Sequence, residues 1–205
     1  MAVKFKVINA SEAEEIFYKL QSNLQLASLN PQYVVFDSMR ENNLNPIFCY
    51  AVEDNNIYLH GFHLSETKSF SVIDIESPYG YGGILSNTND ITFHKKAYLE
   101  YFDWVKNNKI LAEFIKFHPI VDNHKYYLHN VIKNRQTICI NLETSLYEQY
   151  QNRRITDIKR AKEKLKYEIV NNHEMKQIFM KMYYENMNLV QANKFYYFSK
   201  KYFDM

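Results

Sequence analysis

Apolar residues recur with two different periods along the first 145 residues of the chain. Strict alternation of apolar and polar residues predicts β-strands, because successive side chains of a strand point to opposite faces. Spacings of three and four residues predict amphipathic helices. The resulting order is strand, two helices, three-strand meander, glycine loop, helix, strand, short helix or ordered loop, and strand. This order predicts an α/β protein of the α+β kind, built on a mixed sheet.

Capping and turn residues bound these predicted elements. Ser11 and Glu14 form a capping box that begins the first helix, and Pro31 opens the second. A tight turn at 54–56 joins the first two strands of the meander, within "PIFCYAVEDNNIYLHGFHL". The other predicted elements are strands at Lys4–Ile8, "SFSVIDIES" (69–77), Ile110–Ile120 and Gln136–Leu142, and a helix from Ile91 to Lys106.

The pattern changes at Leu146. A highly charged helix leads into a predicted strand, and the residues from Glu174 onward are predicted to be helical. Few strands are expected here, so residues 146–205 are interpreted as a basic linker helix and the start of a second domain that the chain does not finish. Residues 1–145 form the first domain. The apolar face of the last helix is predicted to comprise Ile178, Phe179, Met182, Tyr183 and Met187.

Composition is that of a protein with a sizeable core. Hydrophobic residues make up 46% of the 205 residues, and the net charge of +2 does not by itself indicate a nucleic-acid binder. Cys49 and Cys139 lie in apolar runs and are expected to be buried free thiols, with a disulfide or a catalytic thiol as the alternative. The N-terminus lacks the apolar stretch of a signal peptide, and no window approaches 18 apolar residues. We therefore expect no membrane span and a cytoplasmic location.

Three of the four glycines fall in one short window, "SPYGYGG" (77–83). Gly80, Gly82 and Gly83 can adopt positive φ and let a ligand approach the main chain. A loop that leaves a strand and leads to a helix can present its N–H groups to an anion. Tyr79 and Tyr81 are expected to line a groove beside it. The alternative is a turn that only connects two elements.

Other polar residues are weaker candidates. Lys116 and His118 lie two residues apart on a predicted strand, so they are expected to share a face and to form a wall of the substrate cleft. His60 and His63 are expected to face opposite sides of their strand. The cluster of His118, Asp122 and His124 does not meet the requirement of three or four convergent ligands, so no metal site is expected. Asp74, Glu76 and Glu113 are acidic residues near the loop and are interpreted as surface or structural carboxylates.

The segment "RRITDIKRAKEKLK" (153–166) is strongly basic, with seven Lys or Arg among its fourteen residues. A cationic helix suits the phosphates of tRNA or of a nucleotide-linked precursor. The alternative is a solvated helix face between domains. The candidate phosphate-binding residues are Arg153, Arg154, Lys159 and Arg160.

The order of elements around the glycine loop resembles the GNAT superfamily of acyltransferases. That superfamily carries Gln/Arg-x-x-Gly-x-Gly/Ala where this chain has Ser77 to Gly82, so the glycines match and Ser77 replaces the Gln or Arg. The stretches "DIESPYGYGGIL", "FIKFHPI", "NRRITDIKRAKEKL" and "FMKMYYENMNLVQANKFYYFSKKYF" resemble, more narrowly, the FemAB/FemX-like branch. The resemblance implies two GNAT-like domains side by side, of which this chain holds the first and the opening helices of the second.

The resemblance also implies a function. FemAB-like proteins transfer amino acids from aminoacyl-tRNA to peptidoglycan precursors. The chain is therefore expected to move an aminoacyl or acyl group onto an amine of a peptidoglycan or related sugar precursor. The possible partners include tRNA and, in a homodimer, a second copy of the chain, but not DNA. No tightly bound cofactor is expected. The alternatives are an acetyl-CoA-dependent N-acetyltransferase acting on a small amine or amino sugar, and a non-catalytic GNAT-like binding module.

No catalytic residue is assigned from the sequence. Transfer from an ester to an amine is downhill, so the protein mainly has to orient the reactants and stabilise the tetrahedral oxyanion. No Ser-His-Asp or Cys-His arrangement can be inferred, and none is required for this chemistry.

Overall fold

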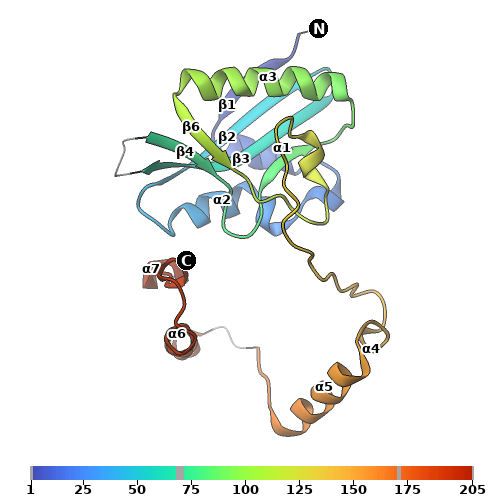
Figure 1. Ribbon diagram of the computed structural model, residues 1–205, viewed down its shortest axis with the longest axis vertical. Coiled ribbons are helices and arrows are strands. Elements are labelled where there is room, and N and C mark those ends of the chain that lie inside the picture. Colours follow the sequence, from blue (N-terminus) through green and yellow to red (C-terminus); the bar gives the residue numbers. More distant parts are fainter. Residues whose placement is uncertain (1, 68–71, 170–171, 205) are drawn as a thin grey trace. The chain divides into compact units, whose positions relative to one another are not determined.

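The chain divides into two compact units. The computed structural model describes residues 2–67, 72–169 and 172–204 (Figure 1). One unit comprises residues 1–132 together with 198–205, and the other comprises residues 133–197. The sequence pattern places a boundary at 145/146, whereas the compact units meet at 132/133 and the last helix belongs to the first unit. That residues 146–205 open a second GNAT-like domain stays a prediction.

The first unit is built on a mixed sheet of six strands. The pairing order is β1-β2-β3-β4-β6, and β5 pairs with β3 beyond the end of β4. Neighbouring strands are antiparallel, except that β4 and β6 run parallel. The expected α/β class with a mixed sheet is thus confirmed. The strands are β1 (Lys4–Ile8), β2 (Leu44–Glu53), β3 (Asn56–Thr67), β4 (Val72–Glu76), β5 (Gly83–Ser86) and β6 (Ile110–Phe114).

Helices cover both faces of this sheet. α1 (Ala10–Phe17) and α2 (Pro31–Ser38) pack on one face, and α3 (Ile91–Asn107) packs on the other (Figure 1). Short 3-10 turns η1 (Ser22–Leu24) and η2 (Ala27–Leu29) join α1 to α2, and η3 (Asn123–Tyr126) follows β6. Because side chains alternate along each strand, the sheet separates two layers of core. The layer under α1 and α2 contains Phe17, Leu20, Val34, Phe48, Leu59 and Leu85, and the layer under α3 contains Cys49, Tyr58, Phe62, Ile75, Ile84, Phe93 and Tyr101.

The caps that begin the helices follow from local chemistry. Asn9, not Ser11, caps α1: its side chain accepts the N–H of Glu12, and the Glu12 carboxylate accepts the N–H of Asn9. The predicted capping box is therefore shifted two residues toward the N-terminus. Asn30 caps α2 with Pro31 in the first turn, and Asp90 caps α3 by accepting the N–H groups of Thr92 and Phe93.

Two predicted strands of residues 1–145 differ from the structure, and the strand predicted after the charged helix does not form in the described residues 165–169. β6 ends at Phe114 instead of Ile120, because the chain beyond it leaves the β4 ladder and contacts the glycine window through separate hydrogen bonds of Lys116 and a bridge between Gly82 and Phe117. Gln136–Leu142 forms no strand: all seven residues are exposed, and none of the described strands pairs with their backbone N–H and C=O groups. Of the predicted strand 69–77, residues 69–71 lie outside the described residues.

The second unit is helical where it is regular. It contains α4 (Leu146–Gln149), α5 (Asn152–Lys164), α6 (His173–Leu189) and the 3-10 turn η4 (Lys194–Tyr196). Many of its apolar side chains are exposed, including Ile138, Leu142, Tyr167 and Ile169. Cys139 is exposed as well, which corrects the expectation of a buried thiol, whereas Cys49 is buried. The closing helix α7 (Lys200–Phe203) returns to the first unit, where Tyr202 packs on Phe36 of α2.

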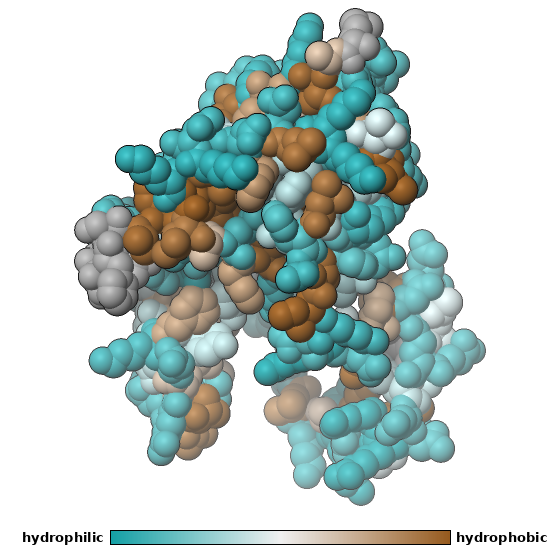
Figure 2. All heavy atoms as spheres, turned by 45° about the horizontal axis from the view of Figure 1, so that its top comes forward, coloured by the Kyte–Doolittle hydropathy of each residue, from teal (hydrophilic) through white to brown (hydrophobic). Residues whose placement is uncertain are grey.

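The surface mixes polar and apolar side chains. On the face seen in Figure 2, hydrophilic residues cover much of the area and hydrophobic ones gather in patches. In the described parts of the chain, no helix combines the length and the apolar character that crossing a membrane requires.

Candidate functional site

The glycine window lies inside the sheet as a break in what is otherwise one strand. β4 and β5 both pair with β3: Glu76 lies opposite His63, and Gly83 lies opposite Gly61. One residue, Phe62, separates the two partners on β3, whereas six residues, 77–82, separate Glu76 from Gly83. Residues 77–82 must therefore leave the plane of the sheet as a loop. The sequence predicted a strand-to-helix turn here, but β5 and the cap of α3 intervene.

One side of this loop is fixed by α2. The N–H of Tyr79 donates to a carboxylate oxygen of Asp37 at 2.8 Å, and the hydroxyl of Tyr33 donates to the Tyr79 carbonyl at 2.7 Å. Asp37 is fully buried. Arg40 extends the network, donating to Glu76 at 3.1 Å and lying 3.8 Å from Asp37. Both main-chain polar groups of Tyr79 are thus held by side chains of α2.

His63 completes this buried network. Its Nε2 lies 2.8 Å from the Val34 carbonyl, so Nε2 carries the proton, and its Nδ1 lies 3.8 Å from Asp37. Burial lowers the pKa of His63, although the Val34 hydrogen bond and the Asp37 charge act in the opposite direction. Burial likewise raises the pKa of Glu76, which Arg40 opposes. The neutral His63 ring therefore serves to connect β3 with α2.

The other side of the loop gathers three of the predicted site residues. The Lys116 ammonium lies 4.8 Å from the centroid of the Tyr81 ring, and the His118 ring lies edge-on to it at 5.0 Å. The expectation that Lys116 and His118 share one side is met around this ring, although neither lies on a regular strand. We call these three side chains the Tyr81 cluster. It combines a cation, an imidazole and an aromatic surface at the loop.

The protonation of His118 decides what the Tyr81 cluster can do. Burial lowers the pKa of His118, so the ring is neutral at pH 7. Its Nδ1 accepts the N–H of Ile120 at 3.2 Å, which leaves the proton on Nε2. His118 is therefore a hydrogen-bond donor through Nε2 and is poorly suited to accept a proton. Together with the Lys116 ammonium, it favours a carbonyl oxygen or an anion.

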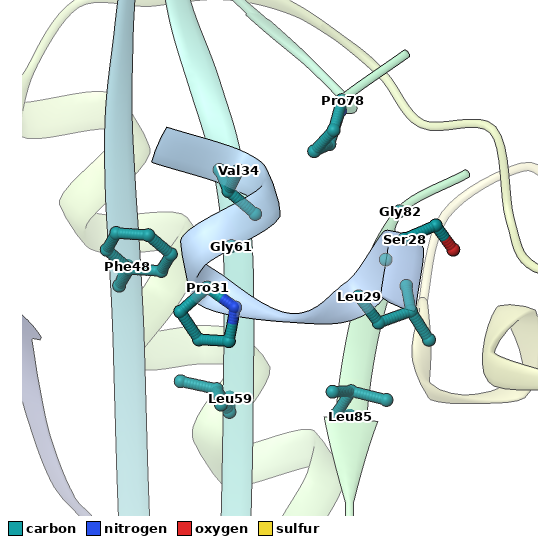
Figure 3. A pocket seen from close by; sticks show the side chains of 11 residues that line it. Ser28, Leu29, Pro31, Val34, Phe48, Leu59, Gly61, Pro78, Gly82 and Leu85 are labelled. Atoms are coloured by element: carbon teal, nitrogen blue, oxygen red, sulfur yellow. The ribbon is translucent and has the colours of Figure 1, made fainter. Parts of the chain in front are cut away.

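An apolar hollow borders the loop on its α2 side (Figure 3). The free volume is about 10 Å³, room for roughly one water-sized group. Gly61 of β3 contributes bare backbone, since an added Cβ would lie 3.1 Å from the Phe48 ring. The lining residues are Ser28, Leu29, Pro31, Val34, Phe48, Leu59, Gly61, Pro78, Gly82, Gly83 and Leu85.

The backbone N–H groups of the loop are partly engaged within the protein. Besides the Tyr79 N–H, the Gly82 N–H donates to the Lys116 carbonyl at 2.9 Å. Gly80 and Gly83 adopt positive φ as expected, whereas Gly82 does not. The N-terminus of α3 is likewise occupied, because Asp90 caps it with its own carboxylate. An anion at this loop would therefore rely on the side chains of the Tyr81 cluster more than on a backbone cradle.

The three acidic candidates point to two different layers. Asp74 and Glu76 share the α2 face of β4, whereas Glu113 faces α3. The Glu113 carboxylate accepts the hydroxyl groups of Tyr101 at 2.6 Å and Tyr127 at 3.0 Å. Burial raises the pKa of Glu113, and these hydrogen bonds counteract the rise. Glu113 and Glu76 act as structural carboxylates inside the first unit, as the sequence analysis interpreted them.

The predicted phosphate-binding residues all lie on α5 in the second unit. Arg153 and Arg160 are two turns apart and share a face of this helix, and Lys159 lies beside Arg160. Arg154 pairs loosely with Asp157 at 3.8 Å. All four side chains are exposed, so their charge is available to a large anion but is screened by salt.

Within the described residues, no three His, Cys, Asp or Glu side chains converge as metal ligands would. Sequence reasoning missed four residues that shape the loop: Tyr33, Asp37, Arg40 and Asn123. The available signal for Asp37 was a charged residue three positions after Val34 on the buried face of its helix. Nothing in the sequence distinguished Asn123.

No protein-family model, no curated protein and no solved structure matches this chain.

Proposed function

We propose that the chain transfers an aminoacyl or acyl group onto an amine of a peptidoglycan or related sugar precursor, as the FemAB-like proteins it resembles do. One observation carries the proposal: the loop that interrupts β4 and β5 brings Tyr81 together with the donors Lys116 and His118, next to the parallel pair β4–β6. Two hydrogen-bond donors that contact the same ring beside the loop suit the oxyanion of acyl transfer.

The proposed chemistry needs little from the protein. The amine nitrogen attacks the ester carbonyl, the C–N bond forms, the C–O bond breaks, and the amine proton ends on the released hydroxyl. The Lys116 ammonium and the Nε2–H of His118 stabilise the negative charge that develops on the carbonyl oxygen. Tyr81 supplies a flat surface against which the acyl group or the acceptor packs. The basic residues of α5, in the second unit, suit the phosphates of tRNA or of a UDP-linked precursor.

A binding module without turnover is the second candidate. Its support is the engagement of the Tyr79 and Gly82 N–H groups by Asp37 and by the Lys116 carbonyl, because groups already paired are less able to bind an oxyanion. An N-acetyltransferase would use the same Tyr81 cluster with acetyl-CoA as the donor.

The test is a transfer assay combined with thermal shifts. tRNA charged with labelled amino acids, or labelled acetyl-CoA, is mixed with a UDP-linked muropeptide or with glucosamine, and the labelled amide is measured. A ligand present at 100 times its Kd raises the unfolding free energy by about 2.7 kcal/mol, which a melting curve detects. We expect the amide to form from aminoacyl-tRNA and the muropeptide.

Matched variants locate the site. Lys116→Ala and His118→Gln are expected to lower transfer on the order of 100-fold, in line with the loss of an oxyanion donor. Lys125→Ala and His124→Gln change the same residue types on η3 and are expected to leave transfer unchanged. Product from acetyl-CoA alone would indicate the N-acetyltransferase. A thermal shift with the muropeptide and no product from either donor would indicate the binding module.

A further inference from the structure

Asn123 connects the two segments that carry the Tyr81 cluster. It begins η3 and is 1% exposed. Its Nδ2 donates to the Gly82 carbonyl at 2.9 Å, and its Oδ1 accepts the His118 N–H at 3.0 Å. Gly82 directly follows Tyr81. One buried amide therefore binds the backbone next to Tyr81 and the backbone of His118 at the same time.

The surrounding contacts show how closely this amide is fitted. An added Cβ at Gly83 would lie 2.7 Å from Asn123 Nδ2 and 2.8 Å from the Phe117 ring, distances that real Cβ atoms do not adopt. The Gly82 N–H donates to the Lys116 carbonyl, and Gly82 bridges to Phe117. Gly82 is therefore held at its N–H by the segment after β6 and at its carbonyl by Asn123.

No regular ladder holds these segments together. β6 ends at Phe114, so beyond it a single bridge and two hydrogen bonds of Lys116 replace the continuous strand pairing, and none of these involves the His118 backbone. A side-chain amide is suited to the task because it offers a donor and an acceptor on one rigid plane. An aspartate would keep the acceptor for His118 but would set a carboxylate oxygen against the Gly82 carbonyl.

We propose that Asn123 is a positioning residue, which sets the distance between Tyr81 and His118 by binding Gly82 and His118 with one amide. The effect of Asn123 on transfer rests on the proposed function, because the Tyr81 cluster can act on a carbonyl only with its donors in place. The effect of Asn123 on the contact between Tyr81 and His118 can be tested without any substrate.

The test compares two Asn→Asp variants of the full chain by NMR. Asn123→Asp removes the donor to Gly82 and keeps the acceptor for His118. Asn87→Asp is the matched control, because the Asn87 amide accepts the Ile57 N–H and donates to the Asn55 carbonyl, both at 2.8 Å. Both variants are expected to lower the melting temperature, since each leaves a backbone carbonyl without its donor.

Only Asn123→Asp is expected to abolish the cross-relaxation between the ring protons of Tyr81 and His118 and to move the His118 ring signals toward those of an exposed imidazole. If Asn123→Asp does not fold, Asn123→Ser is measured in its place. Persistence of the Tyr81–His118 contact in the Asn123 variant, or its equal loss in Asn87→Asp, would overturn the proposal. These outcomes are independent of the transfer assay, so a failed inference and a failed function remain distinguishable.

Discussion

At the scale of single residues, the sequence predicted how the two strand histidines are oriented relative to each other. Their burial in the structure determines their protonation. Their spacing predicted that His60 and His63 face opposite sides of β3, and this is confirmed: His63 contacts α2, and His60 packs between Phe62 and Tyr101 under α3. Both rings are fully buried. Among the described residues, neither ring nitrogen of His60 finds a hydrogen-bond partner. His60 is therefore an aromatic core residue with a hidden titratable group.

This group makes stability depend on acid. Burial lowers the pKa of His60 from 6.5 to about 3, so the folded state holds the neutral ring and the unfolded chain takes up the proton first. The contribution of His60 to the unfolding free energy therefore has its full value above pH 6.5, and it decreases as the pH falls from 6.5 toward 3. At pH 5 the loss amounts to about 2 kcal/mol, taking 1.36 kcal/mol per pKa unit. Urea unfolding of the wild type and of His60→Phe at pH 7 and 5 should show a smaller acid loss in the variant.

The control for this prediction is His124→Phe, which makes the same change at an exposed imidazole on η3. Its acid loss should equal that of the wild type, because both proteins retain the buried His60 ring. An equal loss of stability in His60→Phe and the wild type would show that His60 is not the group responsible.

At the scale of elements, the sequence predicted the helices and strands that local residue patterns determine. It did not predict the features that depend on which strands pair. The hairpin β2–β3, the helix after Pro31 and the helix α3 were predicted close to their bounds, because turn residues and helical spacing are local signals. The glycine loop was predicted to lead to a helix. Its actual place inside a strand depends on β3 pairing with both β4 and β5, which no local pattern contains. The Tyr81 cluster was predicted in its members, whereas Asp37 and Asn123 emerged only from tertiary contacts.

The loop offers a matched pair of glycines that separates backbone strain from packing. Gly80 and Gly83 adopt φ of +102° and +105°, so alanine is strained at either position, by about 1–3 kcal/mol. An added Cβ at Gly80 meets nothing within 4 Å, whereas at Gly83 it meets Asn123 and Phe117. Gly83→Ala should therefore lower the unfolding free energy by a further 1–3 kcal/mol or so, the usual cost of overpacking. Urea unfolding of both variants measures the difference, and equal costs would mean that β5 can shift away from Asn123.

At the scale of the whole molecule, the charge is divided unevenly along the chain. The segment 153–166 holds seven of the 25 Lys and Arg residues and two of the 23 acidic ones. The remainder therefore has 18 basic and 21 acidic side chains and a net charge of −3. The net charge of +2 is therefore the sum of a strongly positive segment, 153–166, and a negative charge on the other residues. Binding of a polyanion should accordingly depend on α5 and little on the overall charge.

This distribution predicts how binding to tRNA responds to salt. Each phosphate contact releases counterions and adds about 0.7–0.9 to the slope of log K against log salt concentration. Replacing Arg153, Arg154, Lys159 and Arg160 by alanine should reduce that slope by roughly 3 for fluorescently labelled tRNA titrated at several salt concentrations. The control replaces four exposed lysines of the first unit, Lys4, Lys19, Lys95 and Lys106, and removes the same charge. If both quadruple variants reduce the slope equally, binding follows net charge alone and α5 is a solvated helix face; a loss confined to the α5 variant locates the phosphates on that helix.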